Sequence, residues 1–123
     1  MTMQDLRQYS SMRAETERLS RRLNELRLEL AEDKSEETQK AVSALYVQIE
    51  ALHRRQLVKE HEITKQLEQI EDAQIRTSIQ LHYIDGYTWN DVADAIGGGN
   101  TEDSCKKRVS RYFKSCPTCH ERT

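Results

Sequence analysis

Residues that interrupt helices are scarce in this chain. Its 123 residues include only four glycines and one proline, whereas 33% are charged and 36% are hydrophobic. Because glycine and proline break helices while many charged residues favour them, this composition predicts an all-α fold with a large exposed surface. The length is enough for one ordinary domain, or for a small domain with an extended helical arm, and it excludes two full-sized globular domains.

Long apolar runs and a paired cysteine set are also missing. Neither a signal-peptide stretch nor a run that could span a bilayer occurs, so we expect no membrane partner. The three cysteines all follow position 104, and their odd number argues against a disulfide framework. We therefore expect a cytoplasmic protein.

The net charge of −2 excludes a simple polycation that binds nucleic acid everywhere. The basic excess is local instead, because five bases and two acids lie between Thr101 and Lys114. A short basic segment of this kind is typical of a helix that reads a DNA groove.

Residues 1–71 show apolar positions at alternating steps of three and four, which predicts an antiparallel helical hairpin of the coiled-coil type. A short break is expected within residues 31–40, with Asp33 or Ser35 as the cap, and the second helix should end near Glu71. The two narrow stripes leave apolar edges uncovered, so we expect a homodimer through these helices. The residues that we assign to the core are Tyr9, Met12, Thr16, Leu19, Leu23, Leu26 and Leu30 in the first helix, and Val42, Leu45, Tyr46, Ile49, Leu52, Gln56, Ile63, Leu67 and Ile70 in the second.

Residues 72–115 predict three short helices that form a helix-turn-helix domain. Asp72, Thr88 and either Asn100 or Thr101 are the expected N-caps, and Gly86 and Gly97 are the expected ends of the first two helices. On the last helix, Cys105, Val109, Tyr112 and Phe113 should point inward.

The outer face of that last helix is the predicted DNA-binding surface. Lysine and arginine side chains suit phosphates or guanine edges, and a serine near a helix start suits a phosphate. Glu102 and Asp103 stabilise the helix start through its dipole, or accept a hydrogen bond from cytosine. A nucleotide-binding loop is excluded because the three glycines follow a helix and precede Asn100, Thr101 and Glu102. The predicted DNA-binding residues are Ser104, Lys106, Lys107, Arg108, Arg111 and Lys114.

The segments "RTSIQLHYIDGYTWNDVADAIG" and "NTEDSCKKRVSRYFK" resemble region 4 of bacterial sigma factors. They are more similar to the RinA/ArpU-like regulators of Gram-positive phages and integrated elements, which join a helical arm to a sigma-region-4-like helix-turn-helix. The resemblance covers roughly residues 70–114 and implies a regulator of phage or mobile-element genes. No sigma region 2 accompanies it, so a complete sigma factor is not expected.

The tail, residues 116–123, contains Cys116, Cys119 and His120. This C-x-x-C-H spacing matches covalent haem attachment, which requires export, and it also supplies half of a tetrahedral zinc site. A flexible tail with reduced thiols is the simpler interpretation, so we expect no metal and no cofactor.

No catalytic motif occurs in the sequence, so we expect a protein that is not an enzyme. Three functions remain: a sequence-specific transcriptional regulator that binds double-stranded DNA, a phage DNA-packaging protein similar to small terminase subunits, or a module that binds RNA polymerase or a sigma factor. The regulator is the favoured hypothesis.

Overall fold

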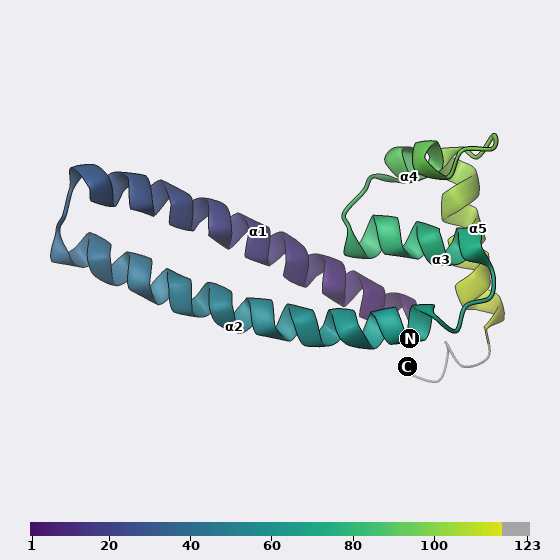
Figure 1. Cartoon of the computed structure of the whole chain (residues 1–123), viewed down its shortest axis with the longest axis horizontal. Helices are drawn as coiled ribbons and strands as arrows, with labels where there is room; N and C mark the ends of the chain where they lie inside the picture. Colours follow the sequence, from purple (N-terminus) through teal and green to yellow (C-terminus); the bar gives the residue numbers. More distant parts are fainter. Residues whose placement is uncertain (117–123) are drawn as a thin grey trace. The chain divides into compact units, whose positions relative to one another are not determined.

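The computed structural model describes residues 1–116 and is built from helices (Figure 1). In chain order these are α1 (Met3–Glu32), α2 (Glu36–Leu67), α3 (Ala73–Ile79), the π-helical segment η1 (Gln80–Ile84), α4 (Trp89–Ile96) and α5 (Glu102–Ser115). No strand occurs within the described residues, which confirms the predicted all-α class. Not one helix of this part of the chain has the length and apolar character needed to cross a bilayer.

The link between α1 and α2 spans three residues and uses both candidate caps. Ser35 is the N-cap of α2, because its hydroxyl accepts a hydrogen bond of 3.2 Å from the Thr38 backbone N–H. The Asp33 carboxylate in turn accepts a bond of 3.1 Å from the Ser35 N–H. The break therefore forms where the sequence predicted it.

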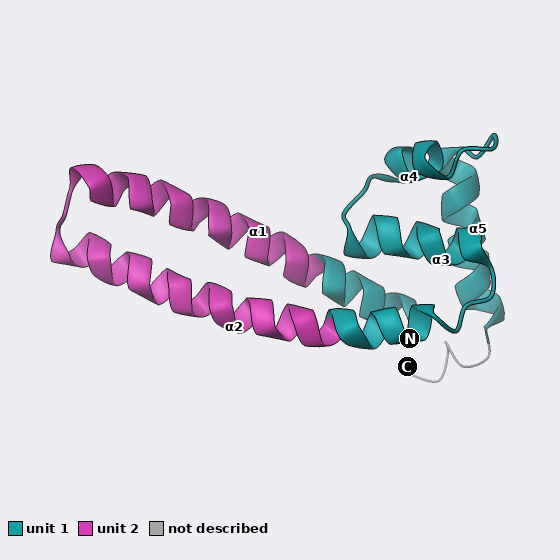
Figure 2. Ribbon diagram, in the orientation of Figure 1, with its two compact units in different colours: residues 1–10, 60–123 teal, residues 11–59 magenta. Residues whose placement is uncertain are grey.

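The described residues form two compact units (Figure 2). One consists of residues 11–59, which include most of α1 and most of α2. Its buried side chains are leucines at the expected positions, namely Leu19, Leu23, Leu26 and Leu52.

Tyr46 does not join this set: 48% of it is exposed, so its assignment to the core is wrong. One residue advances a helix by about 100°. Leu45 and Ile49 of the same helix are half-buried, and Tyr46 is turned away from them.

The described part of the other unit combines residues 1–10 with residues 60–116. The start of α1 and the end of α2 thus belong to the same unit as α3, η1, α4 and α5 (Figure 2). Its main core consists of Leu6, Tyr9, Ile63, Leu67, Ile70, Ile79, Ile84, Val109 and Phe113. A smaller core of Val92, Ala93 and Cys105 joins α4 to α5, and the Cys105 thiol is fully buried there as a small apolar group.

The helix α2 ends at Leu67 rather than near Glu71. The N–H groups of Gln69 and Ile70 bond to carbonyls three residues back, which tightens the chain out of the α-helix. The Ile70 carbonyl then accepts a bond of 2.6 Å from the Arg76 guanidinium. These contacts turn the chain before Asp72, which begins the next helix.

The predicted caps of the short helices are confirmed. The Asp72 carboxylate accepts bonds from two N–H groups at the start of α3, and the Thr88 hydroxyl accepts one from the Asp91 N–H. Gly86 has a φ of 84°, the left-handed conformation expected at the end of the first of these helices. The sequence did not predict η1, the wider π-helical segment between α3 and Gly86.

Candidate nucleic-acid interface

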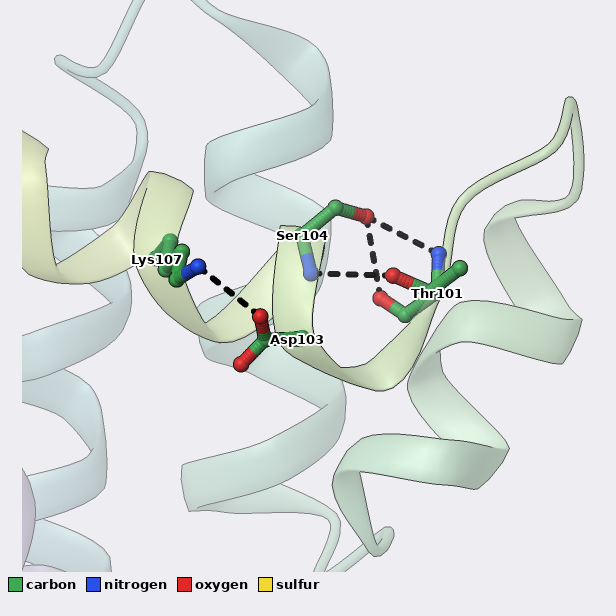
Figure 3. A network of polar contacts seen from close by, with 4 residues as sticks. All are labelled: Thr101, Asp103, Ser104 and Lys107. Atoms are coloured by element: carbon green, nitrogen blue, oxygen red, sulfur yellow. Dashed lines mark hydrogen bonds and ion pairs between the residues drawn. The ribbon is translucent and has the colours of Figure 1, made fainter.

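The helix α5 begins in a reciprocal hydrogen-bond pair between Thr101 and Ser104 (Figure 3). The Thr101 hydroxyl accepts a bond of 3.1 Å from the Ser104 N–H, and the Ser104 hydroxyl accepts one of 2.9 Å from the Thr101 N–H. Two backbone donors that a helix start leaves unpaired are thereby satisfied. Thr101 rather than Asn100 is therefore the N-cap.

A turn of three glycines leads into this cap. Gly97, Gly98 and Gly99 all have positive φ values, between 64° and 81°, which other residues rarely adopt. The Asn100 amide closes the turn by donating a bond of 2.7 Å to the Gly97 carbonyl. Such a turn fixes where α5 starts relative to α4.

Arg108 holds this arrangement from the side of α5. Its guanidinium donates a bond of 2.6 Å to the Gln74 side-chain oxygen on α3 and one of 3.0 Å to the Asn100 side-chain oxygen. Arg108, one of the predicted DNA-binding cations, thus also stabilises the packing of α5 against α3 and the glycine turn. Gln74 was not anticipated, since it lies 34 residues away in the sequence.

The inward side of α5 is apolar. Cys105, Val109 and Phe113 are buried as predicted, whereas Tyr112 is half-buried at the edge. On a helix of 3.6 residues per turn, Lys107, Arg111 and Lys114 lie within roughly 60° of one another on the opposite side. All three are exposed, and Lys106 is exposed on one flank of the same helix.

Lys107 is joined to Asp103 one turn earlier by an ion pair of 2.9 Å (Figure 3). The hydrogen bond from the Lys107 ammonium lowers the pKa of the Asp103 carboxyl, and the positive charges of Lys107 and Lys106 add to this effect. Asp103 is therefore ionised at neutral pH. Because both side chains are exposed, water competes with this pair.

A surface hollow of about 550 Å³ lies between α3 and α5. Cationic side chains line it together with hydroxyl, aromatic and apolar groups. The lining residues are Ile75, Thr101, Asp103, Ser104, Lys107, Arg108, Arg111, Tyr112 and Ser115. The structure thus brings four of the six predicted DNA-binding residues to one concave surface, whereas Lys106 and Lys114 do not line it.

The Ser104 hydroxyl has a role that the sequence did not predict. It accepts a bond from the Thr101 N–H and donates one of 3.0 Å to the Thr101 carbonyl. The hydroxyl hydrogen of Ser104 is thus already donated to the Thr101 carbonyl within the N-cap. The capping pattern of Thr101 followed by Ser104 is readable in the sequence and could have indicated this role.

His82 is a packing residue that contacts Trp89 and Tyr87. Its imidazole stacks on the Trp89 ring with centroids 4.0 Å apart, and its Nδ1–H donates a bond of 2.8 Å to the Tyr87 carbonyl. These contacts join η1 to the start of α4.

The weak metal-site candidates of the sequence are Cys116, Cys119 and His120. Cys116 is half-buried at the end of α5, whereas Cys119 and His120 lie outside the described residues. Within residues 1–116, no three His, Cys, Asp or Glu side chains are grouped as metal ligands would be.

Comparison with known proteins gives no match to a family model, to a curated protein or to a solved structure.

Proposed function

We propose that the protein is a sequence-specific transcriptional regulator that binds double-stranded DNA through α5. In this proposal the segment from α3 to α5 acts as a helix-turn-helix, and residues 1–71 form a hairpin arm that makes a homodimer. The resemblance of residues 70–114 to sigma region 4 supports a role at genes of phages or mobile elements, in the cytoplasm.

One observation carries the proposal: the apolar side of α5 is buried, and Lys107, Arg111 and Lys114 are exposed on the other side. A helix fixed in this way offers its cationic face to the major groove, where lysine and arginine bind phosphates and guanine edges. Asp103 holds Lys107 in position until a phosphate replaces the carboxylate. Arg108 acts mainly by fixing α5 to α3 and to the glycine turn.

Alanine variants of single cations test this assignment. We expect Lys107→Ala and Arg111→Ala to weaken duplex binding by about 1 to 3 kcal/mol where a base is read, and more uniformly across sequences where only a phosphate is bound. Arg18→Ala is the control, since Arg18 is an exposed cation of α1. Fluorescence anisotropy with a site selected from genomic fragments gives the affinities. Unchanged binding by both α5 variants at moderate salt would refute the assignment.

The rival functions predict other results. A packaging protein of the small-terminase type would form a ring of many subunits, whereas the regulator forms a dimer. A module that binds RNA polymerase or a sigma factor would capture polymerase without being retained on duplex DNA. A symmetric dimer that binds DNA implies two related half-sites in the operator.

A further inference from the structure

The helix α2 has a second apolar face, on the side away from its buried residues. Tyr46, Val47, Leu57 and Val58 are exposed by 48%, 65%, 49% and 62%. Eleven residues make about three helical turns, so Tyr46 and Leu57 lie on one line along the helix, and Val47 and Val58 lie on the adjacent line. Glu50 and Arg54 lie between these apolar residues and are joined by an ion pair of 3.7 Å. Single exposed apolar residues are ordinary, but a row on one face marks a contact surface.

This face is symmetric in the sequence about Leu52. Tyr46 and Val58 lie six residues to either side of it, Val47 and Leu57 five residues, and Glu50 and Arg54 two residues. Two copies of α2 can pack in opposite directions about a two-fold axis that is perpendicular to the helices and level with Leu52. Each residue of the face then meets the partner residue at nearly the same height and on the same line of the helix. Apolar residues then meet apolar residues, and the acid meets the base.

We propose that the self-pairing face, defined as Tyr46, Val47, Glu50, Arg54, Leu57 and Val58, packs against the same face of a second copy in an antiparallel two-fold contact. Tyr46 packs on Leu57 of the partner subunit, and Val47 packs on Val58 of the partner subunit. Between them, Glu50 pairs with Arg54 of the partner subunit. This contact specifies the surface of the homodimer in the proposed function and rests on that part of it alone, since it requires no DNA.

The charges select both the occupant and its direction. A two-fold contact uses one patch twice, so the patch must be complementary to itself. Parallel packing would place Glu50 against Glu50 and Arg54 against Arg54, and this repulsion disfavours it. Antiparallel packing creates two intersubunit acid–base pairs within an apolar surround. A second copy of this chain is thus the partner that the pattern fits.

Light scattering on the full chain at micromolar concentration tests the face. We expect a dimer for the parent, a monomer with unchanged helical circular dichroism for Val47→Glu/Leu57→Glu, and a dimer for Leu28→Glu. Leu28 is the matched control because it is 72% exposed on α1. A monomeric parent would overturn the contact and the homodimer, while DNA binding would still be measurable on its own. A dimeric double variant would overturn the self-pairing face alone.

Mixing of two charge variants tests the pairing. Glu50→Arg gives a chain with two bases at positions 50 and 54, and Arg54→Glu gives a chain with two acids there. We expect each variant alone to dimerise at least about 10-fold more weakly than the parent, and their equimolar mixture to recover the dimer. The recovery cannot come from the ion pair within α2, because neither chain has one acid and one base. If mixing restores no dimer, the proposed pairing is overturned.

Discussion

Replacing Arg108 with alanine separates its structural role from its proposed place in a DNA-binding surface. The change removes two charge-assisted hydrogen bonds, of 2.6 Å to Gln74 and 3.0 Å to Asn100. Such bonds contribute about 1.5 to 3 kcal/mol each when well shielded, but the bond to Gln74 is exposed and the bond to Asn100 is only partly buried. We therefore expect the free energy of unfolding to fall by about 2 kcal/mol in total.

Urea unfolding followed by Trp89 fluorescence measures this loss. Trp89 is the single tryptophan of the chain, and its stacking on His82 makes its emission sensitive to the unit that contains α5. With a denaturant dependence of roughly 1.5 kcal/mol per molar urea, the midpoint should fall by about 1.3 M.

Two variants complete that experiment. Arg108→Lys keeps the charge but loses the planar fork, so its midpoint should be intermediate. Arg111→Ala removes an exposed cation from the same helix and should change the stability by less than about 0.5 kcal/mol. Equal midpoints for Arg108→Ala and Arg111→Ala would refute the idea that Arg108 fixes α5 in place.

Three further predictions follow from caps, core and charge. Thr101→Ala should lower the free energy of unfolding by about 1 kcal/mol because the N-cap of α5 is lost, and Thr101→Ser should retain it, as urea unfolding would measure. Ile79→Ala should lower the free energy of unfolding by about 2 to 5 kcal/mol, because Ile79 is fully buried. Leu28→Ala, at an exposed position, should lower it by under about 0.5 kcal/mol. Thermal unfolding of the two variants measures the difference. Asp103→Asn releases Lys107 and should tighten duplex binding in anisotropy titrations. Because the pKa of Asp103 is lowered in the folded chain, the stability from this pair is present above the pKa of the unfolded chain and is lost only as pH falls through the folded value. Urea midpoints of the parent and Asp103→Asn should therefore differ by a constant amount between pH 6 and 8.

Helix boundaries were predictable where short-range chemistry decides them. Asp72, Thr88 and Thr101 each cap a helix through N–H groups two or three residues away, so the pattern is visible in the sequence. The buried side of α5 was equally visible, because Cys105, Val109 and Phe113 recur at helical spacing. The end of α2 was missed by a few residues, since it depends on a contact between the Ile70 carbonyl and the Arg76 side chain.

Features that depend on packing were not predictable. The assignment of Tyr46 to the core was wrong. An apolar residue at the edge of a buried stripe is itself buried only if the neighbouring helix also covers that edge, and the sequence does not show this. The partners of Arg108 were not visible either, because Gln74 is distant in the sequence. By contrast, the four-residue spacing of Asp103 and Lys107 is typical of an ion pair within a helix and could have been anticipated.

The concave surface between α3 and α5 required the structure. The sequence indicated a basic helix and its exposed positions. It did not indicate which of the cations would also form hydrogen bonds to other elements of the fold. Lys107, Arg108 and Arg111 all line the hollow, yet only Arg108 is bonded to α3 and to the glycine turn. The sequence thus named four of the residues that line this hollow, but it did not indicate their individual contacts.

The salt dependence of duplex binding tests the central claim, that the exposed face of α5 binds DNA phosphates. Each phosphate contact contributes about 0.9 to the slope of log affinity against log salt concentration. We expect Lys107→Ala/Arg111→Ala/Lys114→Ala to reduce that slope by about 2 to 3 relative to the parent. The control Arg18→Ala/Arg21→Ala/Arg55→Ala removes three exposed cations from α1 and α2 and should leave the slope unchanged. Equal slopes for the two triple variants would contradict the account.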